Sequence, residues 1–346
     1  MATIKDIAKT AGVSTATVSM VLNGKDCISK KTRERVLTAA RELSYIPSNA
    51  AKTLKTNKSR CIALFIGDIA NPFFPEITKG VEEAAKKRDY SVIIYDLFGK
   101  NRDLIGQIDR AVSRHVDGLF LTGGSEVSER ERARLTELAD QGIRVVTTNR
   151  AMEWGKFPVI RLDEEEQVEG LLSKLVAYGH RHIACLSGYP GYWVSEIRDR
   201  IFKRVLEQYG LYRPEYVISG GFDFEDGREA TLRLLREHPE VTAVMCVNDT
   251  LAIGCQAAAR QIGRRIPEEL SIFGIDGIRC MRYFYPEIST IDTHRYQCGY
   301  DGCMRLIDLI ECGKKTPPEE LQRAITIQCT IRSDATIAPP PDLRIA

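Results

Sequence analysis

The stretch "GVSTATVSMVLNGK", Gly12 to Lys25, decides the fold of the N-terminal part of the chain. Its glycine can end a preceding helix, because glycine adopts the left-handed backbone conformation at little steric cost. Ser14 then supplies an N-cap for a second helix, and the apolar residues of that helix fall on one stripe: Val18, Val21 and Leu22. The pattern predicts two short helices joined by a tight turn at Gly12 and Val13.

Helices are predicted on both sides of this stretch. Thr3 is a candidate cap for the first helix, whose apolar face is Ile4, Ile7, Ala8 and Ala11. Ser29 is a candidate cap for the third helix, whose buried face would be Val36, Ala39, Ala40 and Leu43. Three helices of this kind predict a helix-turn-helix domain over residues 1–46. Its second helix would present five side chains to a DNA groove: Thr15, Ala16, Thr17, Ser19 and Met20.

Charge supports a nucleic-acid partner for this domain. The first 60 residues contain 12 Lys and Arg against 4 Asp and Glu, a balance of +8. Since the whole chain carries +2, the other 286 residues carry −6. A small basic domain on an acidic body is typical of a polyanion-binding module. A phosphate-binding loop is excluded, because the G-x-x-x-x-G-K-[ST] spacing is absent; an ordinary helical hairpin remains the alternative.

Length and composition indicate a multidomain protein of the cytoplasm. At 346 residues the chain exceeds the size at which one core stops growing, so we expect two or three domains. No stretch approaches the roughly 18 apolar residues of a membrane span, and no apolar signal segment opens the chain. The ten cysteines form no C-x-x-C pair, which favours reduced thiols over disulfides or a metal site. We expect no metal, no cofactor and no membrane partner.

From Cys61 onward, short apolar runs alternate with helical stretches in two successive series. The first series includes "CIALFIGD", "YSVIIYDL" and "VDGLFLTGG", and the second includes "HIACLSG", "AVMCVND" and "ELSIFGID". Buried strands separated by helices predict two doubly wound parallel-sheet lobes, so the fold class is a small all-α head on an α/β body. Open sheets of this kind bind ligands beyond the carboxyl ends of their strands, where two facing lobes would form a cleft.

The segment "TIKDIAKTAGVSTATVSMVLNGK", followed by "ISKKTRERVLTAARELSYIPSNAAKTLKTNKS", resembles the DNA-binding domain of the lactose/galactose-repressor family. "VDGLFLTG", "CVNDTLAIG", "IPEELSIFGIDG" and "PEISTID" resemble the periplasmic-sugar-binding-like core of the same repressors. The resemblance implies a hinge over residues 47–60 and an effector-binding and dimerisation domain over residues 61–346. Its lobes would comprise about 61–162 with 292–321, and about 163–290 with 323–338. The chain would cross between them near Asp163, Ser289–Asp292 and Leu321–Arg323.

For DNA binding, the resemblance implies that Thr15, Ala16 and Met20 read bases, while Thr17 and Ser19 lie nearer the backbone. Ala16 and Met20 cannot form bidentate hydrogen bonds, which favours contact with thymine methyl groups. The segment from Pro47 to Lys55 would become helical on DNA and insert Leu54 into the minor groove; a plain linker is the alternative. The remaining DNA-binding candidates are Thr3, Ser14, Asn23, Ala51 and Lys55.

For the effector, the resemblance implies a pocket that suits a polyhydroxylated ring, with Arg198 of "IRDRIF" as the ligand-clamping arginine and Phe222 as the stacking aromatic. The other candidates are Asn71, Phe73, Phe74, Asn149, Asn248 and Asp276. Arg161 and Arg295 fall where relatives often carry apolar or aromatic pocket residues. If both face the cleft with Arg198, three guanidinium groups favour a phosphate or carboxylate as effector; the alternative is that they pair with acids such as Glu164 or Asp292.

These observations predict a sequence-specific transcriptional regulator, most simply a repressor that acts as a homodimer on a pseudo-palindromic operator. The helix "PEITKGVEEAAKKRDY" would contribute to the dimer interface by resemblance. The effector would be a sugar or a sugar phosphate, acting as inducer or corepressor. Two other classes stay as alternatives: a sugar-processing enzyme, for which no catalytic motif is present, and a transport-type sugar-binding protein, which the basic head disfavours.

Overall fold

The computed structural model describes residues 2–22, 24–25, 27–46, 58–97, 103–123, 127–148, 157–313, 317 and 319–341. The chain divides into two compact units, Met1–Ser59 and Arg60–Ala346, called here the head and the body. Each unit has its own buried apolar core among the described residues. In this part of the chain, no helix is both long enough and apolar enough to cross a membrane.

The head is built from three short helices: α1 (Ile4–Ala11), α2 (Thr15–Leu22) and α3 (Lys30–Glu42). Thr3, Ser14 and Ser29 cap them, since each side-chain oxygen accepts a hydrogen bond from the backbone N–H three residues on. Gly12 ends α1 with a φ of 62°, the left-handed conformation that the sequence predicts for it. The apolar stripes meet in a core of Ile7, Ala8, Ala11, Val18, Val21, Val36, Ala39 and Ala40.

The first lobe of the body contains a six-stranded parallel sheet in the order β11-β5-β4-β3-β1-β2. Its strands are β1 (Cys61–Ile66), β2 (Ser91–Asp96), β3 (Gly118–Leu121), β4 (Arg144–Thr148), β5 (Val159–Asp163) and β11 (Ile325–Gln328). Its helices are α5 (Phe73–Lys87), α6 (Leu104–Ser113), α7 (Glu129–Asp140), α12 (Arg295–Glu311) and α13 (Glu319–Gln322). Alternate residues of β1 face opposite layers: Ile62 and Leu64 pack with α5 and α12, whereas Ala63 and Phe65 pack with α6 and α7.

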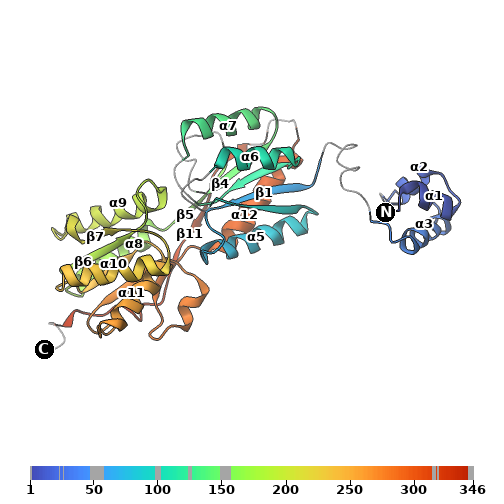
Figure 1. Cartoon of the computed structure of the whole chain (residues 1–346). Helices are drawn as coiled ribbons and strands as arrows, with labels where there is room; N and C mark the ends of the chain where they lie inside the picture. The colour runs from blue at the N-terminus through green and yellow to red at the C-terminus, as the bar shows by residue number, and fades with distance from the viewer. Residues whose placement is uncertain are drawn as a thin grey trace. The chain divides into compact units, whose positions relative to one another are not determined.

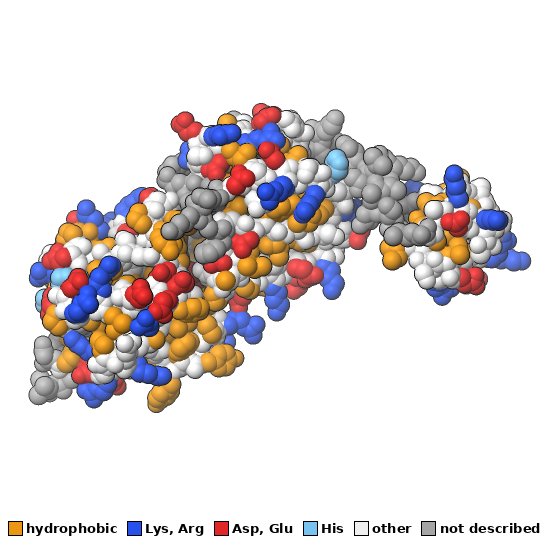
Figure 2. Space-filling model, in the orientation of Figure 1, with side chains coloured by type: hydrophobic (Ala, Val, Ile, Leu, Met, Phe, Trp, Pro, Cys, Tyr) orange, Lys and Arg blue, Asp and Glu red, His pale blue; other side chains and the backbone are white. Residues whose placement is uncertain are grey.

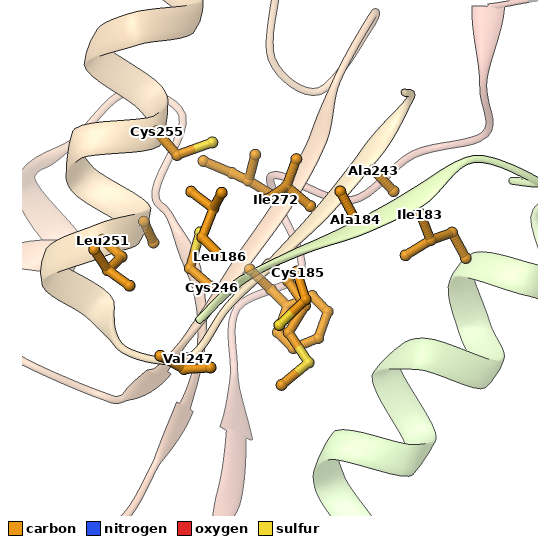
Figure 3. Close-up of a cluster of buried hydrophobic side chains, with 14 of the residues drawn as sticks. Ile183, Ala184, Cys185, Leu186, Ala243, Cys246, Val247, Leu251, Cys255 and Ile272 are labelled. Atoms are coloured by element: carbon orange, nitrogen blue, oxygen red, sulfur yellow. The ribbon is translucent and has the colours of Figure 1, made fainter. Parts of the chain in front are cut away.

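The second lobe contains another six-stranded sheet, in the order β12-β10-β9-β8-β6-β7, in which β12 alone runs antiparallel. Its strands are β6 (Ile183–Ser187), β7 (Val217–Ser219), β8 (Ala243–Cys246), β9 (Ser271–Asp276), β10 (Ser289–Asp292) and β12 (Thr330–Arg332). Its helices are α8 (Glu165–Ala177), α9 (Trp193–Gln208), η1 (Pro214–Tyr216), α10 (Phe224–Glu237), α11 (Asp249–Gln261) and η2 (Arg279–Tyr283). Figure 3 shows part of the core, where Cys255 points from α11 toward the strands.

Cysteine is used in this protein mainly as a small buried residue. All ten cysteines are free thiols, and six of them are buried. Cys246 and Cys255 lie on one side of the second sheet and Cys185 on the other (Figure 3), and burial raises the pKa of the Cys185 and Cys246 thiols. Among the described residues, no group of three His, Cys, Asp or Glu side chains is arranged to hold a metal ion.

The chain passes between the two sheets after β5, after β10 and at Cys329. The third passage corrects the prediction of a crossing at Leu321–Arg323. Beyond those residues the chain first forms β11, which pairs with β5 from Ile325 opposite Ile160 to Gln328 opposite Asp163. The apolar side chain of Ile327 is buried in the first-lobe core, which keeps this segment in the first lobe until residue 328. Figure 1 shows β5 and β11 side by side at the junction of the lobes.

Helices α5 and α12 approach so closely that glycines are required at their contact. A Cβ atom on Gly80 would collide with the carbonyl oxygen of Tyr296, and one on Gly299 would collide with that of Ile77. The backbone of each helix therefore blocks a side chain on the other. This contact makes α5 and α12 one layer over the first sheet.

The replacement Gly80→Ala should destabilise the body by about 1–3 kcal/mol, because the added methyl group forces the two helix backbones apart. The control is Gly170→Ala on the exposed face of α8, where a Cβ meets no atom within 4 Å. That change should stabilise the protein by about 0.5–1 kcal/mol, the difference in helix propensity. Midpoints of urea unfolding give both values. Equal changes in the two variants would contradict the close packing of α5 on α12.

Candidate DNA-binding surface and effector site

The second helix of the head has a buried face and an exposed face. Val18 and Val21 are buried against the other two helices. The opposite face exposes Ser14, Thr15, Ala16 and Met20, whereas Thr17 and Ser19 are half-buried. Met20 is 37% exposed, which is high for a large apolar side chain and leaves it available to a partner surface. The predicted base-reading residues thus share one accessible face of α2.

Three side chains that are predicted to contact DNA already form hydrogen bonds within the head. The exposed Thr3 hydroxyl donates to Asp6 over 2.7 Å, which completes the cap of α1. The Ser14 and Thr17 hydroxyls lie 2.9 Å apart at the start of α2. Their oxygens can still accept a hydrogen bond but are oriented by these local bonds. Asn23, Ala51, Leu54 and Lys55 lie outside the described residues.

The cations of the head divide into structural and exposed groups. Arg35 donates to the carbonyl oxygens of Ala11 and Gly12, so it ties α3 to the turn between α1 and α2. Five lysines on α1, after α2 and at the start of α3 are instead exposed: Lys5, Lys9, Lys25, Lys30 and Lys31. Figure 2 shows more basic than acidic side chains on the face of the head that is in view. Such a distribution favours a phosphate backbone as partner.

In the second lobe, the predicted ligand-clamping arginine is buried in a network of its own. Arg198 on α9 is 4% exposed and forms a bidentate pair with Glu164, with both N–O distances at 2.6 Å. It also donates to Asp276 over 3.3 Å and to the carbonyl oxygen of Val247. Glu164 comes just before α8, and the sequence did not identify it as the partner of Arg198.

The charges of this network are mutually compensated. Burial by itself would lower the pKa of Arg198, but the carboxylates of Glu164 and Asp276 outweigh it, so the pKa of the guanidinium is raised. Burial raises the pKa of Asp276 to about 7, although Arg198 acts in the opposite direction. A carboxyl group with such a pKa can accept or donate a hydrogen bond near neutral pH. Arg198 and Asp276 together therefore form a polar site suited to hydroxyl groups.

Asn248 forms two hydrogen bonds within the protein at the start of α11. It is 4% exposed, and its Oδ1 accepts from the N–H of Leu251 as the N-cap of α11. Its Nδ2 donates to the carbonyl oxygen of Phe222 over 3.0 Å. The Asn248 amide therefore positions the loop that carries Phe222, and one amide hydrogen and one Oδ1 lone pair remain for a ligand.

Phe222 belongs to an aromatic cluster at the ends of β6 and β7. Its ring centroid lies 5.2 Å from that of Tyr192 and 5.7 Å from that of Tyr189. A Cβ atom on Gly188 would collide with the Phe222 ring and with Ser195 Oγ, so this ring and this hydroxyl both lie against Gly188. Ser195 Oγ is buried and has no hydrogen-bond partner among the described residues. Of this cluster only Phe222 was predicted from the sequence, and the aromatic loop "GYPGYW" was the available signal for Tyr189 and Tyr192.

The predicted first-lobe residues mainly build the start of α5. Asn71 Oδ1 accepts from the N–H of Phe73 over 2.9 Å, as expected of a turn residue. Phe74 is 7% exposed and belongs to the core, where it touches the half-buried Phe73 edge to face with centroids 5.0 Å apart. Phe73 is thus the more accessible of the two rings. Asn149 lies outside the described residues.

The two additional arginines occupy different surroundings. Arg161 on β5 is half-buried, and its Nε has no hydrogen-bond partner among the described residues. Arg295 is 1% exposed and donates through Nη2 to Glu76 over 2.8 Å and to the carbonyl oxygen of Gly277 over 2.9 Å. Its acidic partner is therefore Glu76, and not Glu164 or Asp292 as the sequence suggested. Those two acids pair with Arg198 and Arg332.

Each of the two units matches a known protein family. Residues 60–334 match the family described as periplasmic binding proteins and sugar binding domain of the LacI family, and residues 3–48 match the bacterial regulatory proteins of the lacI family. The chain is 33% identical over 314 residues to the transcriptional repressor CytR of Escherichia coli K12, covering 90% of each protein. It is also 33% identical over 340 residues to the ribose operon repressor of Haemophilus influenzae, covering 96% of this chain and 98% of that protein.

Solved structures show the same fold. The lac repressor dimer bound to operator and the anti-inducer ONPF has a TM-score of 0.84 at 23% identity, over 97% of this chain and 99% of that one. A regulator from Enterococcus faecium with bound ribose has a TM-score of 0.69 at 25% identity, over 81% and 99% of the respective chains. With both units matched by the two family descriptions, the chain belongs to the LacI family of bacterial regulatory proteins, which are transcription regulators and not enzymes.

Proposed function

We propose that this protein is a repressor that binds a pseudo-palindromic operator as a homodimer in the cytoplasm, and that a small polar effector bound between its lobes switches its operator affinity. The observation that carries this proposal is the exposed face of α2, with Thr15, Ala16 and Met20 accessible on a basic helix-turn-helix head. A helix of this kind fits the major groove, while the surrounding lysines neutralise phosphates. Two heads related by a two-fold axis read two half-sites.

The base contacts follow from the side chains available. The methyl group of Ala16 and the thioether of Met20 suit thymine methyl groups, and the Thr15 hydroxyl can donate to or accept from a base edge. The DNA backbone is contacted by the polar residues Thr3, Ser14, Thr17, Ser19 and Asn23. In the hinge, Leu54 inserts into the minor groove between base steps, flanked by Ala51 and Lys55.

The effector is a sugar or a sugar phosphate. Arg198 and Asp276 bind its hydroxyl groups, and Phe222 stacks on its ring, as their placement at the carboxyl ends of the second sheet favours. The other proposed contacts are Asn71, Phe73, Phe74, Asn149, Arg161 and Asn248, with Arg295 added only if the effector is a phosphate or carboxylate. Similarity to the ribose operon repressor and to a regulator with bound ribose supports a carbohydrate. The effector shifts the population between two lobe arrangements that differ in operator affinity.

The test has two arms. Operator duplexes are first selected from random DNA by the full-length protein, and binding to selected and scrambled duplexes is compared at fixed salt. Thermal unfolding is then followed with ribose and with ribose 5-phosphate. An effector at 100 times its Kd adds about 2.7 kcal/mol of stability. Equal affinity for both duplexes would contradict a sequence-specific repressor, and a shift with the phosphate alone would assign Arg161 and Arg295 to the ligand.

The replacement Met20→Ala should weaken binding to the selected operator by about 1 kcal/mol, roughly fivefold, because an apolar base contact is lost. Fluorescence anisotropy with labelled duplex measures this affinity. The control is Leu37→Ala on α3, since Leu37 is 41% exposed and Met20 37%. The control should change affinity by less than twofold. If both variants lost the same affinity, Met20 would have no special place at the operator.

The replacement Arg198→Ala should abolish the effector response and destabilise the body by about 3–5 kcal/mol, because it leaves buried carboxylates without their cation. The pKa of Asp276 is already about 7 in the folded protein against an ordinary value of 3.8, and it should rise further without Arg198. A folded pKa above the unfolded one makes stability fall as pH rises. The deficit relative to wild type should therefore be larger at pH 8 than at pH 5.

Thermal unfolding at the two pH values measures this deficit. Arg204→Ala on the same helix is the control, since Arg204 is 43% exposed and pairs with Glu165 and Glu169 at the surface. Its loss should cost less than about 1 kcal/mol at either pH. A pH-independent deficit in Arg198→Ala would show that Asp276 does not depend on the guanidinium.

A further inference from the structure

The turn after β9, Asp276 to Ile278, is fixed by hydrogen bonds on its N–H side. Asp276 has a φ of 126°, a conformation that costs free energy in any residue other than glycine. The N–H of Gly277 donates to Thr290 Oγ1 over 3.1 Å, and the N–H of Ile278 donates to Asp249 Oδ2 over 2.7 Å. The Thr290 hydroxyl donates to Asp249, so both anchors belong to one buried unit of the second lobe.

Two arginines hold the carbonyl side of the same turn. Arg295 Nη2 donates to the carbonyl oxygen of Gly277 over 2.9 Å, and Arg332 Nη1 donates to the same oxygen over 2.8 Å. Arg332 also donates to the carbonyl oxygen of Ile278 over 2.8 Å. Arg332 lies on β12 of the second lobe, whereas Arg295 begins α12 of the first lobe. One carbonyl oxygen next to Asp276 therefore accepts hydrogen bonds from both lobes.

Glu76 on α5 connects this carbonyl to the first lobe. Its Oε2 accepts from Arg295 Nη2 over 2.8 Å, through the same nitrogen that binds Gly277. Its Oε1 lies 3.8 Å from Nε of Arg279, which belongs to η2 of the second lobe. Because α5 and α12 pack as one layer, Glu76 and Arg295 both belong to this layer of the first lobe.

The charge of Arg295 makes this connection sensitive to Glu76. Arg295 is 1% exposed, and its Nε and Nη1 are buried without a hydrogen-bond partner among the described residues. A buried cation with unmet donors depends on its ionic partner, since removing that partner leaves an uncompensated charge. Without the Glu76 carboxylate, the Arg295 guanidinium would lower its free energy by turning toward water, where its charge is hydrated. It would then release the carbonyl oxygen of Gly277.

We propose that Glu76 and Arg295 are positioning residues that hold the Asp276 turn of the second lobe in register with helix α5 of the first lobe. The inference rests on the proposed effector site, where Asp276 binds the ligand. Through this connection the first lobe favours one geometry of Asp276. A ligand that shifts the position of Asp276 would in turn shift α5 through Arg295 and Glu76. Neither residue has to touch the ligand for this effect.

Hydrogen–deuterium exchange of the full-length protein tests the connection without DNA or ligand. In Glu76→Gln, the amides of Gly277 and Ile278 should exchange at least threefold faster than in wild type. Glu83→Gln is the matched control on α5, because Glu83 accepts from Tyr296 over 2.6 Å and pairs with Lys87 at 3.1 Å, both in the first lobe. Exchange at the turn should stay at the wild-type rate in this control. An unchanged rate in Glu76→Gln, or an equal rise in both variants, overturns the proposal.

Two further variants separate positioning from general destabilisation. Glu76→Asp keeps the charge and should restore slower exchange than Glu76→Gln; it also serves if the glutamine variant does not fold. Arg295→Met should accelerate exchange at the turn by itself, and adding Glu76→Gln should change nothing more, because Glu76 acts through Arg295. Additive effects of the two replacements overturn the connection.

The exchange assay also separates the two proposals. A wild-type protein that fails to bind selected operator or any sugar overturns the proposed function. Its exchange rates at the turn still decide whether Glu76 and Arg295 hold Asp276.

Discussion

The buried guanidinium of Arg198 is the interaction on which the ligand-facing end of the second lobe depends. It joins α9 to Glu164 before α8, to the carbonyl end of β8 and to Asp276 at the end of β9. These segments are far apart in the sequence, and their strand ends carry polar groups that cannot be left unpaired in a buried site. The planar, permanently charged guanidinium satisfies them together, which an ammonium group could not do with the same geometry.

Features that depend on local sequence were predictable from the chain alone. The caps at Thr3, Ser14 and Ser29 and the left-handed Gly12 each act within a few residues, and the structure has all four. The alternating strands and helices of the body were likewise predictable, because buried parallel strands form distinct apolar runs. The third lobe crossing was misplaced, since β11 is four residues long and shows no run of that kind.

The pairing of charged residues could not be predicted in the same way. Arg295 and Glu76 are 219 positions apart, and several other acids near the lobe junction were equally plausible partners in the sequence. Asn248 follows a strand, where either a ligand contact or a helix cap is possible, and its hydrogen bonds favour the cap. Ser195, Tyr189 and Tyr192 gather around Phe222 because of loop geometry that no periodicity encodes. Such long-range pairings depend on the arrangement of the two sheets, which the sequence does not specify residue by residue.

The crossing at Cys329 has a mechanical consequence. One residue separates β11 in the first sheet from β12 in the second, and its N–H donates to the carbonyl oxygen of Asp163, where the first crossing begins. Strand pairing fixes the backbone on either side, so a reorientation of the lobes at this strand concentrates in the few dihedral angles around Cys329. We expect these two adjacent crossings, which are joined by a hydrogen bond, to form a hinge between the lobes. From this geometry we expect rotation about a line through the junction and little sliding of one sheet past the other.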